Sequence, residues 1–393
     1  MSSSNQALET LDSVVSNTVT LIDQLEAVAA SIASERHPAR NGDSSTATQP
    51  APDSAPLDAL ALAHDSATLI KAHATKISLL IINEPFTPTA ITKVLRELVA
   101  GPLPALASAV QLCTAERYTQ TIQRDLSWLG SRVLKELKEL VTRIPKDGKV
   151  LTAEKKNASA GAAAGKGSLA ATGVLWAACD GVVDFSKRGF AGNLVRKAEQ
   201  FRDTLKDMME ELKEWGEETG DDDEDDEDDE DGTDEEDDEV NQVTAGLGAT
   251  SISDTQAMLD DLMNSQQYIP RDDPNKIRER LDSCLRRLRL TTLLYQATVK
   301  RRLKPLPHAP PSADSNISSR LDEIMPLLKK LPERFESLAL AFYELDAPEI
   351  DRLMDQCFFE AFAVSELLAK PWNDQKDEFT DWALKYQVEI KKA

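Results

Sequence analysis

Residues 190–218 read FAGNLVRKAEQFRDTLKDMMEELKEWGEE and decide the fold class. Their apolar residues recur every three or four positions, so they lie on one face of an α-helix with charges of both signs opposite. That face consists of Leu194, Ala198, Phe201, Leu205, Met208, Leu212 and Trp215. The same spacing recurs along the chain, without a strand pair or a fixed-period repeat. The sequence therefore predicts an all-α protein.

A chain of 393 residues exceeds the size at which one core keeps growing, so we expect two helical bundles. The predicted domains are an N-terminal bundle over 1–218, a disordered acidic linker over 219–250 and a C-terminal bundle over 251–393. Flexible links are expected at 37–56 and 145–167, where Pro, Gly, Ser and Ala replace the helical spacing. The predicted helices cover residues 8–35, 57–82, 115–143, 168–188, 190–218, 254–264, 275–303, 315–343, 347–369 and 374–391.

Residues 168–183, SLAATGVLWAACDGVV, predict a helix that begins at a Ser168 cap and ends near a Gly189 C-cap. Gly173 would let a neighbouring helix come close, and Trp176 would fill the space beside it. We place these two residues on one packed side of the helix, together with Leu169 and Val183.

The net charge of −23 comes mostly from one run, because residues 221–239 contain seventeen acids and no Lys or Arg. Such a run attracts basic proteins such as histones, with Asp221, Asp222 and Asp223 as candidate contacts. A solubilising linker is the favoured interpretation, and a specific site for basic proteins is the alternative. An EF-hand is disfavoured because Glu227 and Asp238 stand at the positions that require Asp and Glu, so we expect no metal site.

The predicted helix over 276–304 is basic, with ten Lys or Arg against two acids. A second candidate partner-binding set lies on it, although a merely solvated face would look the same. The set comprises Arg286, Arg287, Arg289, Lys300, Arg301 and Arg302. VKRRLK at 299–304 is compatible with a nuclear import signal. Nucleic acid is disfavoured as a partner because the helix has one aromatic residue, Tyr295, and the protein is acidic.

No residue pattern indicates catalysis or a cofactor. Four cysteines lie far apart without a CxxC pair, so buried free thiols in a reducing compartment are expected. The glycine run before Lys166 misses the phosphate-loop spacing by one residue. A nucleotide hydrolase using Lys166 is therefore kept only as a competing hypothesis. The longest apolar stretch, 77–82, is too short to cross a membrane, which favours a cytosolic or nuclear protein.

The TG before a tryptophan and an Ala-Cys-Asp, followed by an amphipathic helix and an acidic stretch, resembles the cyclin-D-binding (GCIP) family in its fungal form. The residues that carry this resemblance are Gly173, Trp176, Cys179 and Asp180 within 168–216. The resemblance implies helical bundles similar to those of vinculin and α-catenin. It also implies a non-catalytic regulator of the cell cycle that binds D-type cyclins and helix-loop-helix transcription factors, in cytoplasm and nucleus.

The leading hypothesis is thus a non-enzymatic adaptor that binds a cyclin, a cyclin–kinase complex or a helix-loop-helix factor through helix surfaces. A cytoskeletal bundle protein and an acidic chaperone for basic proteins are the alternatives.

Overall fold

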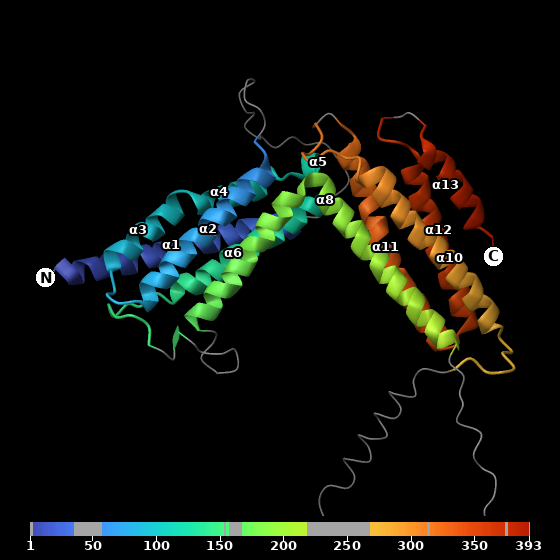
Figure 1. Ribbon diagram of the computed structural model, residues 1–393, viewed down its shortest axis with the longest axis horizontal. Coiled ribbons are helices and arrows are strands. Elements are labelled where there is room, and N and C mark those ends of the chain that lie inside the picture. Colours follow the sequence, from blue (N-terminus) through green and yellow to red (C-terminus); the bar gives the residue numbers. More distant parts are fainter. Residues whose placement is uncertain are drawn as a thin grey trace, which may run out of the picture. The chain divides into compact units, whose positions relative to one another are not determined.

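The computed structural model describes residues 3–34, 57–152, 155–156, 167–217, 268–312, 315–373 and 376–392. These residues are overwhelmingly helical and contain no strand (Figure 1), which confirms the all-α prediction. The acidic run, the link at 37–56, the helix expected at 254–264 and Lys166 lie outside the described residues.

The chain divides into two compact units along boundaries that depart from the predicted ones. The first unit combines the residues up to Arg196 with Leu303–Met325, and the second combines Lys197–Arg302 with Pro326–Ala393. The division differs because two helices, α8 (Ser168–Glu217) and α11 (Ile317–Tyr343), each continue from one unit into the other.

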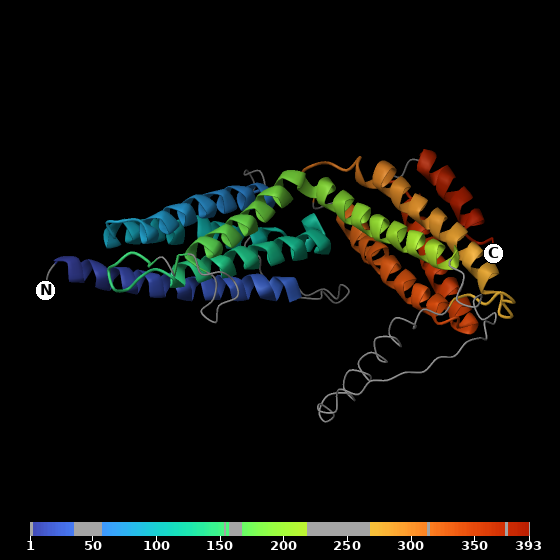
Figure 2. The ribbon, with the colours of Figure 1, turned by 60° about the horizontal axis from the view of Figure 1, so that its bottom comes forward.

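The first unit is a bundle in which helices far apart in the sequence lie side by side (Figure 2). The first half of α8 belongs to it. Helix α1 packs on α6 and α3, and α2 packs on α4. Its fully buried residues include Ile22, Ile70, Leu95, Leu134 and Leu175. The other helices are α1 (Ser3–Ser34), α2 (Ala59–Ile82), α3 (Pro88–Ala100), α4 (Pro102–Leu112), α5 (Ala115–Tyr118) and α6 (Gln120–Thr142).

The single helix predicted over 115–143 is wrong, because the chain breaks at Thr119 between α5 and α6. Thr119 has a φ of 79°, in the left-handed region. The break accompanies a buried contact that the sequence does not reveal. The Tyr118 hydroxyl donates to Asp58 Oδ1 and accepts from the Ala59 N–H, both at 3.0 Å, where α2 begins.

Gly189 interrupts α8, as its predicted role as a C-cap requires, but the helix resumes at once. Its φ of 67° and ψ of −171° lie in a region that only glycine occupies readily. The Phe190 N–H donates to the His308 carbonyl at 2.7 Å. The Asn193 amide donates to the carbonyls of Phe185 and Gly189, each at 2.8 Å, and so satisfies acceptors that the break would leave unpaired.

We expect Gly189→Ala to destabilise the protein by about 3 kcal/mol, because the new Cβ meets a disfavoured φ and ψ. That Cβ would also lie 2.6 Å from the His308 ring. Thermal unfolding measures the effect. Gly173→Ala is the matched control, since a Cβ there meets nothing within 4 Å and alanine favours a helix. Equal stability of the two variants would contradict the requirement for glycine at the break in α8.

The second unit contains the end of α8, α10 (Ile277–Thr298), a π-turn (Val299–Leu303) as far as Arg302, α11 from Pro326 onward, α12 (Ala347–Ala369) and α13 (Glu378–Glu389). Helix α12 packs on α10 and α13 (Figure 1). Trp215 of α8 packs edge-on against Phe342 and Tyr343 of α11. The bounds of α12 match the prediction to the residue.

Helix α11 continues through Pro332, which cannot donate the backbone hydrogen bond that the Leu328 carbonyl expects. The buried Tyr295 hydroxyl of α10 donates to that carbonyl instead. A side chain of one helix thus completes the backbone hydrogen bonding of another.

Helix α8 also has the length and composition of a membrane-crossing helix, because an 18-residue window in it has a mean hydropathy of 1.2. Core helices of bundles have the same property, and 44% of the window is buried within the protein. The window is therefore weak support for a role in a membrane.

Candidate protein-binding faces

The start of α8 differs from the prediction. Ser168 is the first residue of the helix and is buried, and its hydroxyl makes no hydrogen bond to any described residue. The Gly167 carbonyl accepts from the Ala171 N–H at 2.9 Å, so the turn begins one residue earlier. Ser168 as the helix cap is wrong.

The predicted packed side of α8 is also wrong. Leu169 and Trp176 are 45% and 38% exposed, and the space around the Gly173 Cα is open. The side that packs in the bundle consists of Ala171, Thr172, Leu175, Ala178, Cys179 and Val182. Leu, Ala, Gly and Trp occur on every side of this part of α8. The spacing of its apolar residues therefore does not distinguish the buried side from the exposed one.

Three polar contacts fix the first half of α8 antiparallel to α2. Thr172 donates to Ser78 at 3.0 Å, and one turn later the Trp176 indole donates to Thr75 at 3.1 Å. Asp180 pairs with Lys71 at 2.6 Å at the far end of this seam. Trp176 is thus held in place from one edge while part of its ring remains open to a partner.

An exposed face without charge follows from this arrangement, and we call it the α8 face. It extends from Leu169 to Ala177, about two and a half helical turns. Leu79 of α2, near the Thr172–Ser78 contact, is 52% exposed and adds to the apolar surface. Exposed helix surfaces are normally charged, so an uncharged one is typical of an interaction site. The α8 face consists of Leu169, Ala170, Gly173, Trp176 and Ala177.

Cys179 lies on the opposite, buried side of the same helix. Burial raises the pKa of its thiol to about 12, with Asp180 contributing in the same direction. A thiol that stays protonated is a packing group rather than a nucleophile. The other three cysteines are also buried and free, as predicted.

We expect Trp176→Ala to cost about 1 kcal/mol of stability, since much of the ring is exposed. Leu175→Ala removes a fully buried neighbour and is expected to cost about 3 kcal/mol. Chemical denaturation of both variants compares them directly. If Trp176→Ala were as damaging as Leu175→Ala, the tryptophan would be a core residue.

The basic candidates on α10 and on the following π-turn divide into exposed and structural residues. The prediction of Arg302 as a partner-binding residue is wrong. Its side chain is buried and makes a bidentate pair with Asp377, with nitrogen–oxygen distances of 2.5 and 3.0 Å. Its Nε donates to the Leu368 carbonyl at 2.7 Å, and the guanidinium lies 4.3 Å from the Phe379 ring centre. The Arg302 side chain holds the pKa of Asp377 at about 2, so the pair remains ionised at neutral pH.

The other basic candidates remain at the surface. Arg301 is half exposed and pairs with Glu378 at 2.8 Å, and the Arg286 guanidinium donates to the Lys392 carbonyl. Arg289 and Lys300 are exposed. The folded π-turn with its buried Arg302 weighs against 299–304 as an accessible import signal. Asp221, Asp222 and Asp223 lie outside the described residues.

Arg302→Lys is expected to destabilise the protein by about 2 kcal/mol, because lysine keeps the charge but not the planar fork that spans Asp377 and the carbonyls. Urea unfolding measures the loss. Arg301→Lys, next to it on a half-exposed pair, is the control and should stay within about 0.5 kcal/mol of the parent. Equal changes in stability for the two variants would mean that Arg302 stabilises the protein through its charge alone and not through its planar guanidinium.

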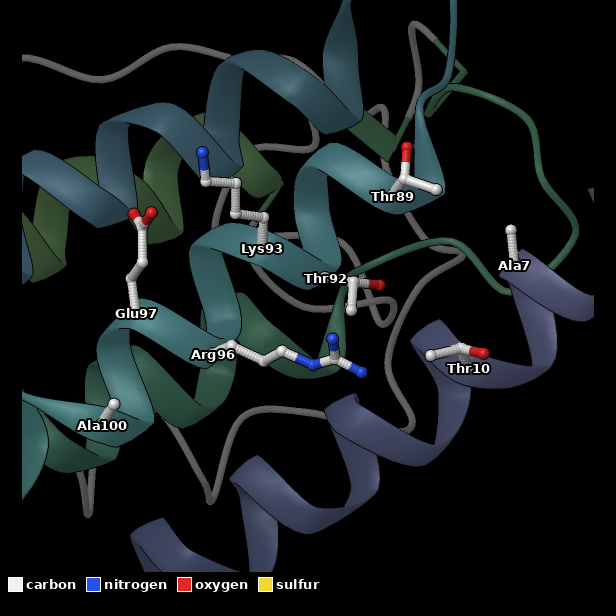
Figure 3. A pocket seen from close by; sticks show the side chains of 8 residues that line it. All are labelled: Ala7, Thr10, Thr89, Thr92, Lys93, Arg96, Glu97 and Ala100. Carbon is white, nitrogen blue, oxygen red and sulfur yellow. The ribbon is translucent and has the colours of Figure 1, made fainter.

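A separate groove of about 440 Å³ lies between α1 and α3 (Figure 3). Thr10 of α1 faces it, and the Arg96 side chain of α3 extends into the space between the helices. Lys93 and Glu97 place opposite charges on its outer border, and the Glu97 carboxylate lies 3.7 Å from His73 Nδ1. This groove has no arrangement of nucleophile and base. The described residues also contain no group of three His, Cys, Asp or Glu side chains that could hold a metal ion.

The fold and these surfaces define an all-α helical-bundle protein whose candidate sites are helix faces. Residues 63–218 match the family described as Grap2 and cyclin-D-interacting, N-terminal. The predicted resemblance is therefore confirmed over a segment that includes the whole α8 face and the adjoining Leu79 of α2.

A curated relative is also similar. An uncharacterized protein of Schizosaccharomyces pombe is 29% identical over 164 residues, which are 42% of this chain and 45% of that protein. The similarity thus spans less than half the length of either protein. Helix α1 lies outside the family match.

Proposed function

We propose that the protein is a non-catalytic adaptor that binds a partner protein through the α8 face. The observation that carries this proposal is the uncharged, exposed surface from Leu169 to Ala177, within the segment that resembles the cyclin-D-interacting family. A protein-binding role is what the family match supports directly. The partner that we propose is a cyclin, a cyclin–kinase complex or a helix-loop-helix factor, which the protein binds in the cytoplasm or the nucleus.

The geometry of the α8 face suits a helix of the partner. Gly173 leaves open space at the centre of the face, so a second helix axis can approach closely. Trp176 stands beside it with its indole anchored on Thr75, and a tryptophan fixed before binding loses little freedom when it is covered. Small residues at the centre and large ones at the border are typical of close helix pairs.

We expect Ala177→Glu to abolish partner capture without unfolding the protein, because it places a charge on the exposed face of a helix. Tagged full chains purified from native cells would be compared by mass spectrometry. Ala30→Glu, the same change at an exposed position of α1, is the matched control.

The parent and Ala30→Glu should recover a cyclin, a cyclin–kinase complex or a helix-loop-helix factor, and Ala177→Glu should lose it. Recovery of none of these by the parent would contradict the partner assignment. Equal recovery by all three chains would exclude the α8 face as the binding site.

A further inference from the structure

A second groove lies in the other unit, outside the residues that match the family. It has a volume of about 580 Å³ and is formed by α10, α12 and the two residues that follow α13, Ile390 and Lys391. Figure 1 shows these three helices side by side. One guanidinium, three phenylalanines and one ammonium group give it its chemistry. We call it the Phe359 groove; these five residues are Arg287, Phe358, Phe359, Phe362 and Lys391.

Phe359 is the most exposed of the large apolar side chains in the described residues, at 71%. A phenylalanine in the middle of α12 contributes nothing to the core from this position, and exposing its ring to water is unfavourable. Phe362, one turn further, is half-buried and continues the same apolar surface. An aromatic pair at the centre of a groove is the usual anchor of a protein interface.

Two cations border the phenylalanines, and neither makes an ion pair with a described residue. The Arg287 guanidinium lies 3.8 Å from the ring centre of Phe358, and its Nε donates to the Ile390 carbonyl at 3.0 Å. The Lys391 ammonium lies 4.2 Å from the ring centre of Phe362. Burial lowers the pKa of Arg287, and the nearby Asp355 carboxylate acts in the opposite direction.

Asp355 also lines the groove and makes the charge pattern mixed. The three phenylalanines need apolar side chains to cover them, and a polyphosphate has none, so the groove disfavours a nucleic-acid backbone. An acidic segment that carries apolar residues complements both the cations and the phenylalanines. Because the groove is formed by helices, it offers no strand edge, and an occupant must satisfy its own backbone hydrogen bonds.

We propose that the Phe359 groove binds an acidic amphipathic helix of a partner protein. Apolar side chains of that helix cover Phe359 and Phe362, and carboxylates on the border of its apolar stripe pair with Arg287 and Lys391. This site is independent of the α8 face, so failure of one proposal leaves the other standing.

The test uses the full chain and a labelled synthetic helix of about eighteen residues, with leucines spaced at i, i+4 and i+7 and glutamates bordering them. A twin peptide carries glutamine for each glutamate. Fluorescence anisotropy should show saturable binding that is about tenfold weaker for the twin. Phe359→Ala should weaken binding about tenfold, and Lys391→Gln about threefold.

Two controls match these changes. Leu340→Ala removes an exposed apolar side chain of α11, and Lys385→Gln removes an exposed cation of α13, and neither residue lines the groove. Both should bind the acidic peptide like the parent. Absence of binding, equal binding of the twin, or full binding by Phe359→Ala would each overturn the proposal.

Evidence that the groove binds another segment would also overturn the proposal. Self-association of the parent that Phe359→Ala abolishes, measured by sedimentation, would assign the groove to a second copy of this chain. Tighter peptide binding after Asp260→Asn and Asp261→Asn would assign it to the acidic stretch 254–264 of the chain itself.

Discussion

The break at Gly189 is the constraint on which the rest of the structure depends. One helix supplies core residues to both units, Leu175 and Cys179 before the break and Leu205 and Leu212 after it. The glycine conformation lets the helix break there, and the Asn193 amide keeps the carbonyls of Phe185 and Gly189 hydrogen-bonded.

The helices were largely predictable, because their limits depend on local chemistry. Asp346 caps α12 by accepting from the Glu349 N–H, and the Lys370–Pro371 step follows its last residue. The break at Thr119 was not predictable in this way. It depends on a tyrosine reaching Asp58, sixty residues earlier in the chain, and no local pattern encodes that contact.

The candidate sites were less predictable than the helices, for two physical reasons. Around Gly173 the sequence is apolar on every side, so only the packing of α2 against Thr172 and Trp176 determines which side remains open. The sequence pattern of the basic helix predicts that Arg302 lies at the surface. Its burial depends on Asp377 and the Leu368 carbonyl, both supplied from much later in the chain. Residue type predicted the chemistry, and tertiary contacts determined its exposure.

The hydroxyl of Tyr295 gives the second unit a further property. Since Pro332 leaves the Leu328 carbonyl without its usual donor, that carbonyl of α11 is hydrogen-bonded to Tyr295 only when α10 is packed beside it. Neither helix is a self-sufficient module, and the pair gains stability together. This coupling favours cooperative assembly of the unit over a stepwise addition of preformed helices, and it ties the integrity of the basic helix to that of its proline-containing neighbour.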